Sequence, residues 1–155
     1  MKRILFKNSI LFIVGFCIYI TAEVLYRGYS YPLMGVCAGT AIIFLDKIND
    51  LLSWDIDILW QCAFGSLLIT LMELLIGKAF LAGYLPVMWD YSSVPLNYEG
   101  IICMPFSLIW AVLSFAAVLL ADAINYYVFQ ELPIPYYKCF GKIILTFPKI
   151  NKRKD

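Results

Sequence analysis

Four long apolar stretches, separated by polar and turn-rich segments, dominate the pattern of this chain. They predict membrane helices over about residues 4–26, 33–45, 58–80 and 101–121, the last with a possible extension to residue 129. Crossing the hydrocarbon core of a bilayer takes about 20 residues of helix. The second stretch reaches that length only with its flanks, 29–31 and 46–48. A short span and a re-entrant hairpin are therefore both open for it.

The first apolar stretch admits two interpretations. Lys2, Arg3 and Lys7 precede an apolar run over residues 10–22, which is also the pattern of a secretory signal peptide. However, Ile20 is a poor residue at the third position before a cleavage point, and further apolar stretches follow. A retained first membrane helix is the favoured interpretation.

The longest polar interruption before the C-terminal region is residues 89–100. It contains residue types that anchor a chain at a membrane interface, cap a turn or form one. These are Trp89, Tyr91, Asp90, Ser92, Pro95, Asn97 and Gly100. We expect a structured loop here, between the third and fourth helices.

Basic residues gather at the two ends of the chain. Nine of the twelve lie there, in residues 1–9 and 138–155, and basic flanks stay cytoplasmic. We therefore expect a protein of a bacterial cell membrane with both termini on the cytoplasmic side. This requires an even number of spans and places the loop on the outer side. The predicted tail serves as a topology anchor or, alternatively, contacts anionic lipid headgroups.

The predicted fold class is an all-α integral membrane protein, a bundle of four transmembrane helices with a structured outer loop. Residues 1–132 would form a single transmembrane domain, and 133–155 a basic cytoplasmic tail. Composition supports this class, because 63% of the 155 residues are hydrophobic and only 15% are charged, against about 25% charged in soluble domains.

Several chemistries are excluded by residue type. The chain has no histidine, which removes Ser-His-Asp and Cys-His catalysis and His-ligated metals. Its five cysteines form no CxxC pair and are interpreted as small buried hydrophobic residues. We predict no catalytic residue, no metal site and no cofactor. The predicted partners are the lipid bilayer and a second copy or a separate membrane or ATPase subunit, with no nucleic acid.

Small and polar residues recur at helical spacing on the third helix and predict a face turned toward protein rather than lipid. They are Cys62, Ser66, Thr70, Glu73 and Gly77. The assumed topology also places a set of ionisable residues toward the outer end of the bundle. This set is Glu23, Arg27, Glu73, Lys78 and Asp90.

Charged groups in lipid need a partner or a function. One interpretation of the ionisable set is structural: Glu23 pairs with Arg27 at i,i+4, and Glu73 pairs with Lys78. The other is a working site for a proton, an ion or a polar headgroup, with loop residues as donors to Glu73. The candidate binding residues are Glu23, Arg27, Glu73, Trp89, Asp90, Tyr91, Ser92 and Asn97.

Residues 20–130 resemble the bacterial putative ABC-transporter type IV family. The resemblance rests on Trp-Asp-Tyr-Ser at 89–92, Pro95, Asn97, Gly100, Ile102-Cys103, the run 105–110, and the earlier Arg27-Gly28-Tyr29 and Glu73. The chain departs from the pattern of the longer family members at Tyr31-Pro32-Leu33-Met34-Gly35, where those members usually have Gly-Pro and Pro-Ile-Tyr-Gly. The resemblance implies a small multi-pass permease.

Three functions are open at this point. A transporter component would use Glu23 and Glu73 to bind a cation or proton, with the loop as an outer gate. A non-catalytic interaction protein would use the helices as a scaffold. A membrane enzyme acting on a lipid-linked substrate would need Glu73 or Asp90 as general base and Arg27 as a phosphate holder. No GxxxxGK[ST] loop is present, so ATP-driven transport would require a separate ATPase.

Overall fold

The computed structural model describes residues 2–48, 53, 55–131 and 133–149, and its architecture is mainly helical. The helices are α1 (Lys2–Arg27), α2 (Pro32–Asp46), α4 (Ile58–Leu81) and α5 (Met104–Ala123), the last continued by the π-helical turn η1 (Ile124–Val128). Two small antiparallel hairpins complete it: β1 (Asn97–Tyr98) with β2 (Ile102–Cys103), and β3 (Tyr136–Cys139) with β4 (Lys142–Thr146).

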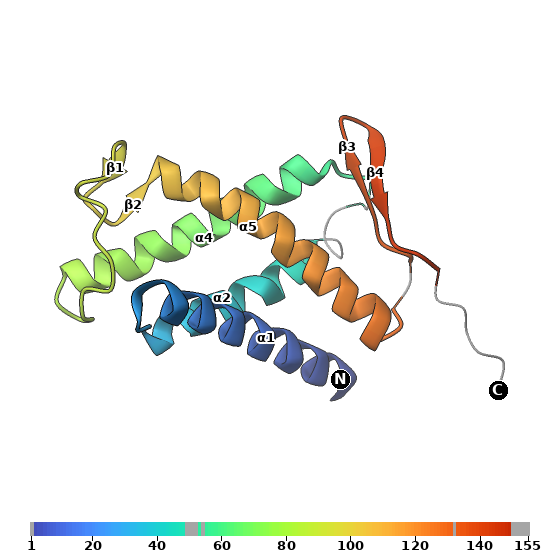
Figure 1. The fold of residues 1–155 in the computed structure, drawn as a ribbon, viewed down its shortest axis with the longest axis horizontal. Helices are drawn as coiled ribbons and strands as arrows, with labels where there is room; N and C mark the ends of the chain where they lie inside the picture. Colours follow the sequence, from blue (N-terminus) through green and yellow to red (C-terminus); the bar gives the residue numbers. More distant parts are fainter. Residues whose placement is uncertain (1, 49–52, 54, 132, 150–155) are drawn as a thin grey trace.

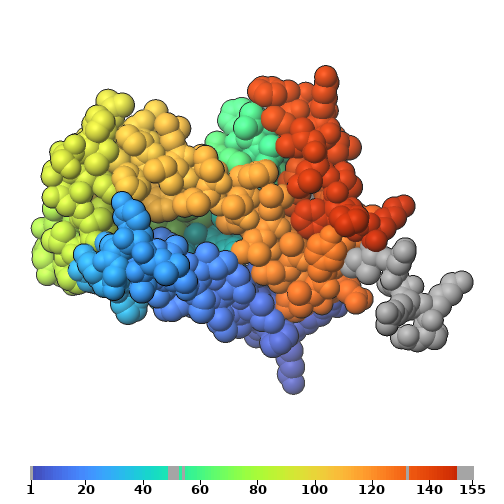
Figure 2. Space-filling view, in the orientation of Figure 1, coloured from blue at the N-terminus to red at the C-terminus, as the bar shows by residue number. Residues whose placement is uncertain are grey.

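The helices form two antiparallel pairs, α1 with α2 and α4 with α5, and α2 joins the pairs by packing against both α4 and α5. The α1–α2 turn and the β1–β2 loop lie together at one end of the bundle, called here the loop end (Figure 1). The start of α1 and the β3–β4 hairpin lie at the opposite, terminal end. The surface is hollowed between α1 and α5 (Figure 2).

Three helices of the described chain have the length and apolar composition to cross a membrane: α1, α4, and α5 with η1. The shorter α2 has 15 residues, about 22 Å at 1.5 Å per residue. Where the sequence predicts four spans, the described chain therefore has three helices of spanning length and one shorter apolar helix. Within its bounds α2 is one continuous helix, not a hairpin.

Small residues let α1 and α2 approach closely. A Cβ added to Gly39 would lie 2.7 Å from the Phe12 carbonyl oxygen, and one added to Gly15 would lie 2.9 Å from the Ala38 carbonyl oxygen. At such distances no other residue type fits without movement of the backbone. The short α2 is therefore held against α1 by backbone proximity.

The loop end is folded, as the sequence predicts. The Asn97 side chain donates to the carbonyl oxygens of Ser92 and Val94 and accepts from the Gly100 N–H, and the Tyr91 N–H donates to the Gly100 carbonyl at 2.8 Å. Buried Met88 and Ile101 pack with Phe80 and Met34 of the helices. These contacts fix the loop on the ends of α2 and α4.

The C-terminal region corrects the purely helical expectation. Residues 136–146, predicted as part of a basic tail, form the β3–β4 hairpin at the terminal end. Tyr137 is buried and donates to Asp122 of α5 at 2.6 Å, and Lys138 pairs with Asp55 just before α4. Residues 150–155 of the predicted tail lie outside the described residues.

The β3–β4 turn explains why the hairpin was missed. Phe140 and Gly141 both have positive φ, 50° and 73°, the arrangement of a two-residue type I′ turn. The usual sequence signal for that turn is Asn-Gly or Asp-Gly, and neither is present here. The hairpin is instead stabilised by the packing of Tyr137 against the helices, which the local sequence does not indicate.

Candidate functional site

The Glu73 carboxylate is the buried acidic group at the centre of the loop end. It lies on α4 and is 4% exposed. Tyr91 of the loop donates its O–H to Oε1 at 3.0 Å, and Trp110 of α5 donates its indole N–H to Oε2 at 2.9 Å. Three segments that are far apart in sequence therefore meet at one carboxylate.

Aromatic stacking holds the two donors in place. The Tyr91 ring stacks on Phe106 with centroids 4.5 Å apart, and Phe106 lies 6.4 Å from Trp110, one turn further along α5. Burial raises the pKa of the Tyr91 hydroxyl, and the nearby Glu73 carboxylate raises it further. Tyr91 consequently remains a hydrogen-bond donor at neutral pH.

No positive charge faces Glu73 in the described part of the chain, where the carboxylate forms no ion pair. The expected pairing with Lys78 is wrong, since Lys78 instead lies 2.6 Å from Glu99 of the loop. A carboxylate held by two neutral donors in an apolar helix bundle still lacks a counter-charge. This is the unusual electrostatic feature of the site.

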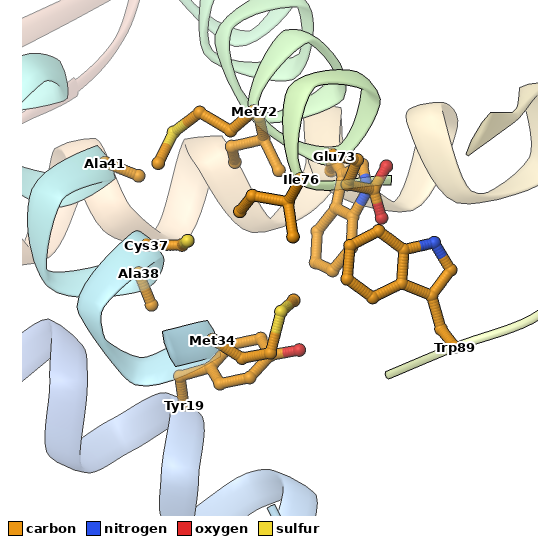
Figure 3. A pocket seen from close by; sticks show the side chains of 11 residues that line it. Tyr19, Met34, Cys37, Ala38, Ala41, Met72, Glu73, Ile76 and Trp89 are labelled. Atoms are coloured by element: carbon orange, nitrogen blue, oxygen red, sulfur yellow. The ribbon is translucent and has the colours of Figure 1, made fainter. Parts of the chain in front are cut away.

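A pocket of about 70 Å³ lies beside Glu73. It opens between α2 and α4 and is bounded at the loop end by Trp89 (Figure 3). Its lining, apart from Glu73, is aromatic, aliphatic or sulfur-bearing: Tyr19, Met34, Cys37, Ala38, Ala41, Ile69, Met72, Ile76, Trp89 and Trp110. The surface of the pocket is thus apolar, and the two carboxylate oxygens of Glu73 are bonded to Tyr91 and Trp110 beside it.

Glu23 and Arg27 form a separate cluster at the same end. Their side chains lie 2.6 Å apart at i,i+4 spacing, as the structural interpretation expects. Tyr19 donates to Glu23 at 3.1 Å and also lines the pocket, so it links the two groups. Arg27 donates to the Met88 carbonyl at 3.2 Å. This pair ties α1 to the loop.

The remaining candidate residues of the loop do not reach Glu73. Asp90 accepts from the Ser92 N–H at 2.8 Å, a bond that lowers the pKa of the Asp90 carboxyl. The Asn97 side chain forms hydrogen bonds with the loop backbone. Asp90, Ser92 and Asn97 are all exposed. The expectation that Ser92 and Asn97 supply donors to Glu73 is wrong, because both residues form their hydrogen bonds within the turns of the loop.

The predicted inward stripe of α4 is confirmed. Ser66 donates to the Ser107 carbonyl of α5 at 2.6 Å, and Thr70 lies 3.0 Å from the Ser107 hydroxyl. A Cβ added to Gly77 would lie 2.5 Å from Ile101. Cys62 packs against the buried cluster around Val118. Glu73 therefore sits on the face of α4 that contacts α5.

Sequence reasoning missed Trp110 and Tyr19 as site residues. Trp110 ends the run 105–110 that carries part of the family resemblance, and Phe106 and Trp110 are four residues apart on a helix, which was a usable signal. Tyr19 lies four residues before Glu23 on α1, and that helical spacing was its only signal. The sulfur-bearing residues of α2 and α4 carried no signal of a pocket.

The comparison with protein families gives one result. The family model described as putative ABC-transporter type IV matches residues 18–151. This range includes Glu73, the loop, Trp110 and the β3–β4 hairpin. No curated protein and no solved structure matches the chain significantly.

Proposed function

The chain belongs to the putative ABC-transporter type IV family, and from this premise we propose that it is the membrane component of a cation transporter that uses the buried Glu73 carboxylate. The observation that carries the proposal is a buried carboxylate, 4% exposed, with two neutral donors and no ion pair among the described residues. An ionisable residue inside a membrane helix bundle is costly, and such residues commonly mark a pathway for a substrate, an ion or a proton.

In this proposal Glu73 holds one positive charge at a time, a proton or a solute cation. Tyr91 and Trp110 orient the two carboxylate oxygens, and Trp89 bounds the pocket on the loop side. Arg27 and the Met88 carbonyl anchor the loop to α1. The loop would act as the outer gate, and both termini would be cytoplasmic.

Two alternatives have less support. A lipid-directed enzyme would need Arg27 for a phosphate, but its guanidinium already binds Glu23 and the carbonyls of Tyr29 and Met88. A pure scaffold would account for the two hydrogen bonds of Glu73 but not for the absence of a counter-charge among the described residues. A separate ATPase subunit would supply ATP hydrolysis, and a second copy of the chain would help to enclose a pathway.

Proton entry into vesicles tests the proposal. Full-length protein is reconstituted into vesicles that enclose a pH-sensitive dye, and a negative-inside potential is applied. We expect faster acidification than in protein-free vesicles, and a rate close to that background for Glu73→Gln. Glu99→Gln is the matched control, because Glu99 is an exposed carboxylate at the same end and should leave the rate unchanged. Equal rates for wild type and Glu73→Gln would contradict the proposal.

A further inference from the structure

The tip of the β3–β4 hairpin presents an aromatic side chain away from the bundle. Phe140 is 84% exposed, and Ile143 and Ile144 of β4, which follow the turn, are exposed as well. Phe140 also has a φ of 50°, a conformation in which glycine or asparagine is favoured and a bulky residue is uncommon. The turn itself therefore gives no reason for a phenylalanine at this position, and the reason lies in what the ring contacts outside the hairpin.

The hairpin stands beside the first turns of α4 and is tied to them (Figure 1). The two carboxylate oxygens of Asp57, which caps α4, accept the Leu59 N–H at 3.1 Å and the Phe140 N–H. Between the β3–β4 turn and the helix lies a groove of about 360 Å³, lined by Asp57, Leu59, Trp60, Ala63 and Phe140. Both oxygens of Asp57 are engaged by backbone, and the other lining residues are apolar. The groove therefore suits an apolar occupant.

The groove lies at one boundary of the bilayer. α4 has 24 residues and is about 36 Å long, against about 30 Å for the hydrocarbon core. Its first turns therefore lie where the hydrocarbon gives way to the polar headgroups. Trp60, the third residue of α4, is 64% exposed, and tryptophan is enriched in this interfacial layer.

The groove also continues the lipid-facing side of α4. From Trp60 an exposed apolar stripe runs along the helix at spacings of three or four residues, through Phe64 and Leu67 to Leu71. Residues at this spacing lie on one helical face, and an exposed apolar face of a spanning helix contacts hydrocarbon. The groove is thus the end of a lipid-covered surface, which favours lipid over a protein partner as its occupant.

The charge of the hairpin matches a phospholipid surface. Residues 136–149 include three lysines and no aspartate or glutamate. Lys138 pairs with Asp55, while Lys142 and Lys149 are exposed. A lysine can lay its aliphatic stem on an apolar surface while its ammonium group stays among polar groups, and basic segments beside membrane helices are attracted to anionic headgroups.

We propose that the β3–β4 hairpin is an interfacial anchor that docks on the bilayer around the bundle. The rings of Phe140 and Trp60 lie in the layer between headgroups and acyl chains, and Lys142 contacts lipid phosphates. Because Asp57 joins the turn to the start of α4, the anchor holds that end of the helix at the membrane boundary. This role goes beyond the proposed transport function and does not depend on it.

Spin labelling measures the depth of the hairpin tip in full-length protein reconstituted into vesicles of phosphatidylcholine and phosphatidylglycerol. In a variant without native cysteines, Phe140→Cys, Trp60→Cys, Leu71→Cys and Lys149→Cys each receive one nitroxide. All four side chains are exposed, so the labels project away from the core of the bundle. The accessibility of each nitroxide to oxygen, which concentrates in hydrocarbon, is compared with its accessibility to a water-soluble nickel complex.

We expect the ratio of oxygen to nickel accessibility to be lowest at position 149, higher at 140 and 60, and highest at 71. Position 71 is the reference for the acyl region, and position 149 is the matched control for an exposed site just after the same hairpin. The ratio at 140 should be several-fold higher than at 149. Equal ratios at 140 and 149 would place the tip in water and overturn the inference. Protection of position 140 from both reagents would place it under protein rather than lipid, and would overturn it as well.

Two further variants test the anchor without a label at the tip. With the nitroxide at position 60, Phe140→Asp should raise the nickel accessibility, because a charged tip leaves the interfacial layer and lets water reach the groove. Phe140→Leu keeps an apolar tip and should leave that accessibility unchanged. Position 71 should remain accessible to oxygen in both variants, which shows that α4 still spans the bilayer. If Phe140→Asp leaves the nickel accessibility at position 60 unchanged, the tip does not cover the groove in the membrane and the anchor is refuted.

Discussion

At the scale of the residue, Glu73 joins α4, the loop and α5 through its two oxygens. Its partners, a phenol and an indole, each have one strong donor, and both are committed to this carboxylate. Removing the carboxylate therefore affects more than the charge of the site. It leaves two donors without an acceptor in an apolar environment, at about 1–3 kcal/mol for each.

Substitutions at Glu73 should consequently rank by their hydrogen-bonding capacity. Glu73→Gln keeps one acceptor oxygen and should lower the thermal unfolding midpoint in detergent only slightly. Glu73→Leu keeps none and should lower the midpoint more strongly. Glu99→Leu is the control: its ion pair with Lys78 is exposed, and such pairs contribute about 0–1 kcal/mol. If Glu73→Leu is as stable as the wild type, the two hydrogen bonds to Glu73 do not hold the loop.

At the scale of the element, the β3–β4 hairpin is fixed to the helices by a small set of polar contacts. Asp55 accepts from Lys138 and Tyr136, and Asp57 accepts from the Phe140 N–H. The bond from Lys138 lowers the pKa of the Asp55 carboxyl, and the same pair raises the pKa of Lys138. The docking of the hairpin is thereby coupled to pH.

The sign of this coupling follows from the two pKa directions. A lowered carboxyl pKa adds stability above the ordinary value of 3.8, and that stability is lost as the pH falls through the lowered pKa. A raised lysine pKa adds stability below the ordinary value of 10.5 that is lost as the pH rises through the raised pKa. The pair therefore stabilises docking between these two limits.

Hydrogen exchange of the β3 amides should report this window. In the wild-type protein, protection should decrease when the pH falls below the window. Lys138→Gln should begin with lower protection at neutral pH and lose less of it on acidification, because its Asp55 no longer has a charged partner. If wild type and Lys138→Gln lose the same protection on acidification, the Asp55–Lys138 pair does not hold the hairpin.

At the scale of the whole molecule, the two ends of the bundle differ in their composition. The loop end carries the Glu73 pocket and a compact aromatic loop. The terminal end carries the buried Lys7, which lies 3.5 Å from Asp46 and 3.1 Å from Glu131. These ion pairs join α1, α2 and the segment after η1. Each end is thus closed by its own polar contacts around an apolar middle.

Cysteine labelling should establish which end faces the cell exterior. In a variant without native cysteines, Tyr84→Cys places a thiol at the loop end, where Tyr84 is 84% exposed. Lys142→Cys places one on the exposed β4 strand at the terminal end. With both termini cytoplasmic, an impermeant maleimide should label position 84 in intact cells and position 142 only after permeabilisation. The reverse labelling would invert the proposed topology.

The sequence by itself determined the helices and the small residues between them. In a membrane a long apolar stretch has few ways to form its backbone hydrogen bonds, and a helix forms all of them within the segment. The helices α1, α4 and α5 accordingly begin and end within a few residues of the predicted bounds. The small and polar stripe of α4 that ends at Gly77 could also be predicted, because helical spacing alone places its members on one face. The folding of the loop was readable from its turn-forming residues.

Only the tertiary structure decided which groups meet. Lys78 is closer to Glu73 in sequence than Tyr91 or Trp110 is, yet its long side chain reaches Glu99 while the two aromatic donors reach the carboxylate. The β3–β4 hairpin likewise depends on the burial of Tyr137 against α5, which no local pattern encodes. Hydrogen bonds between distant segments follow from how helices pack, and that packing is a property of the whole bundle rather than of any one stretch.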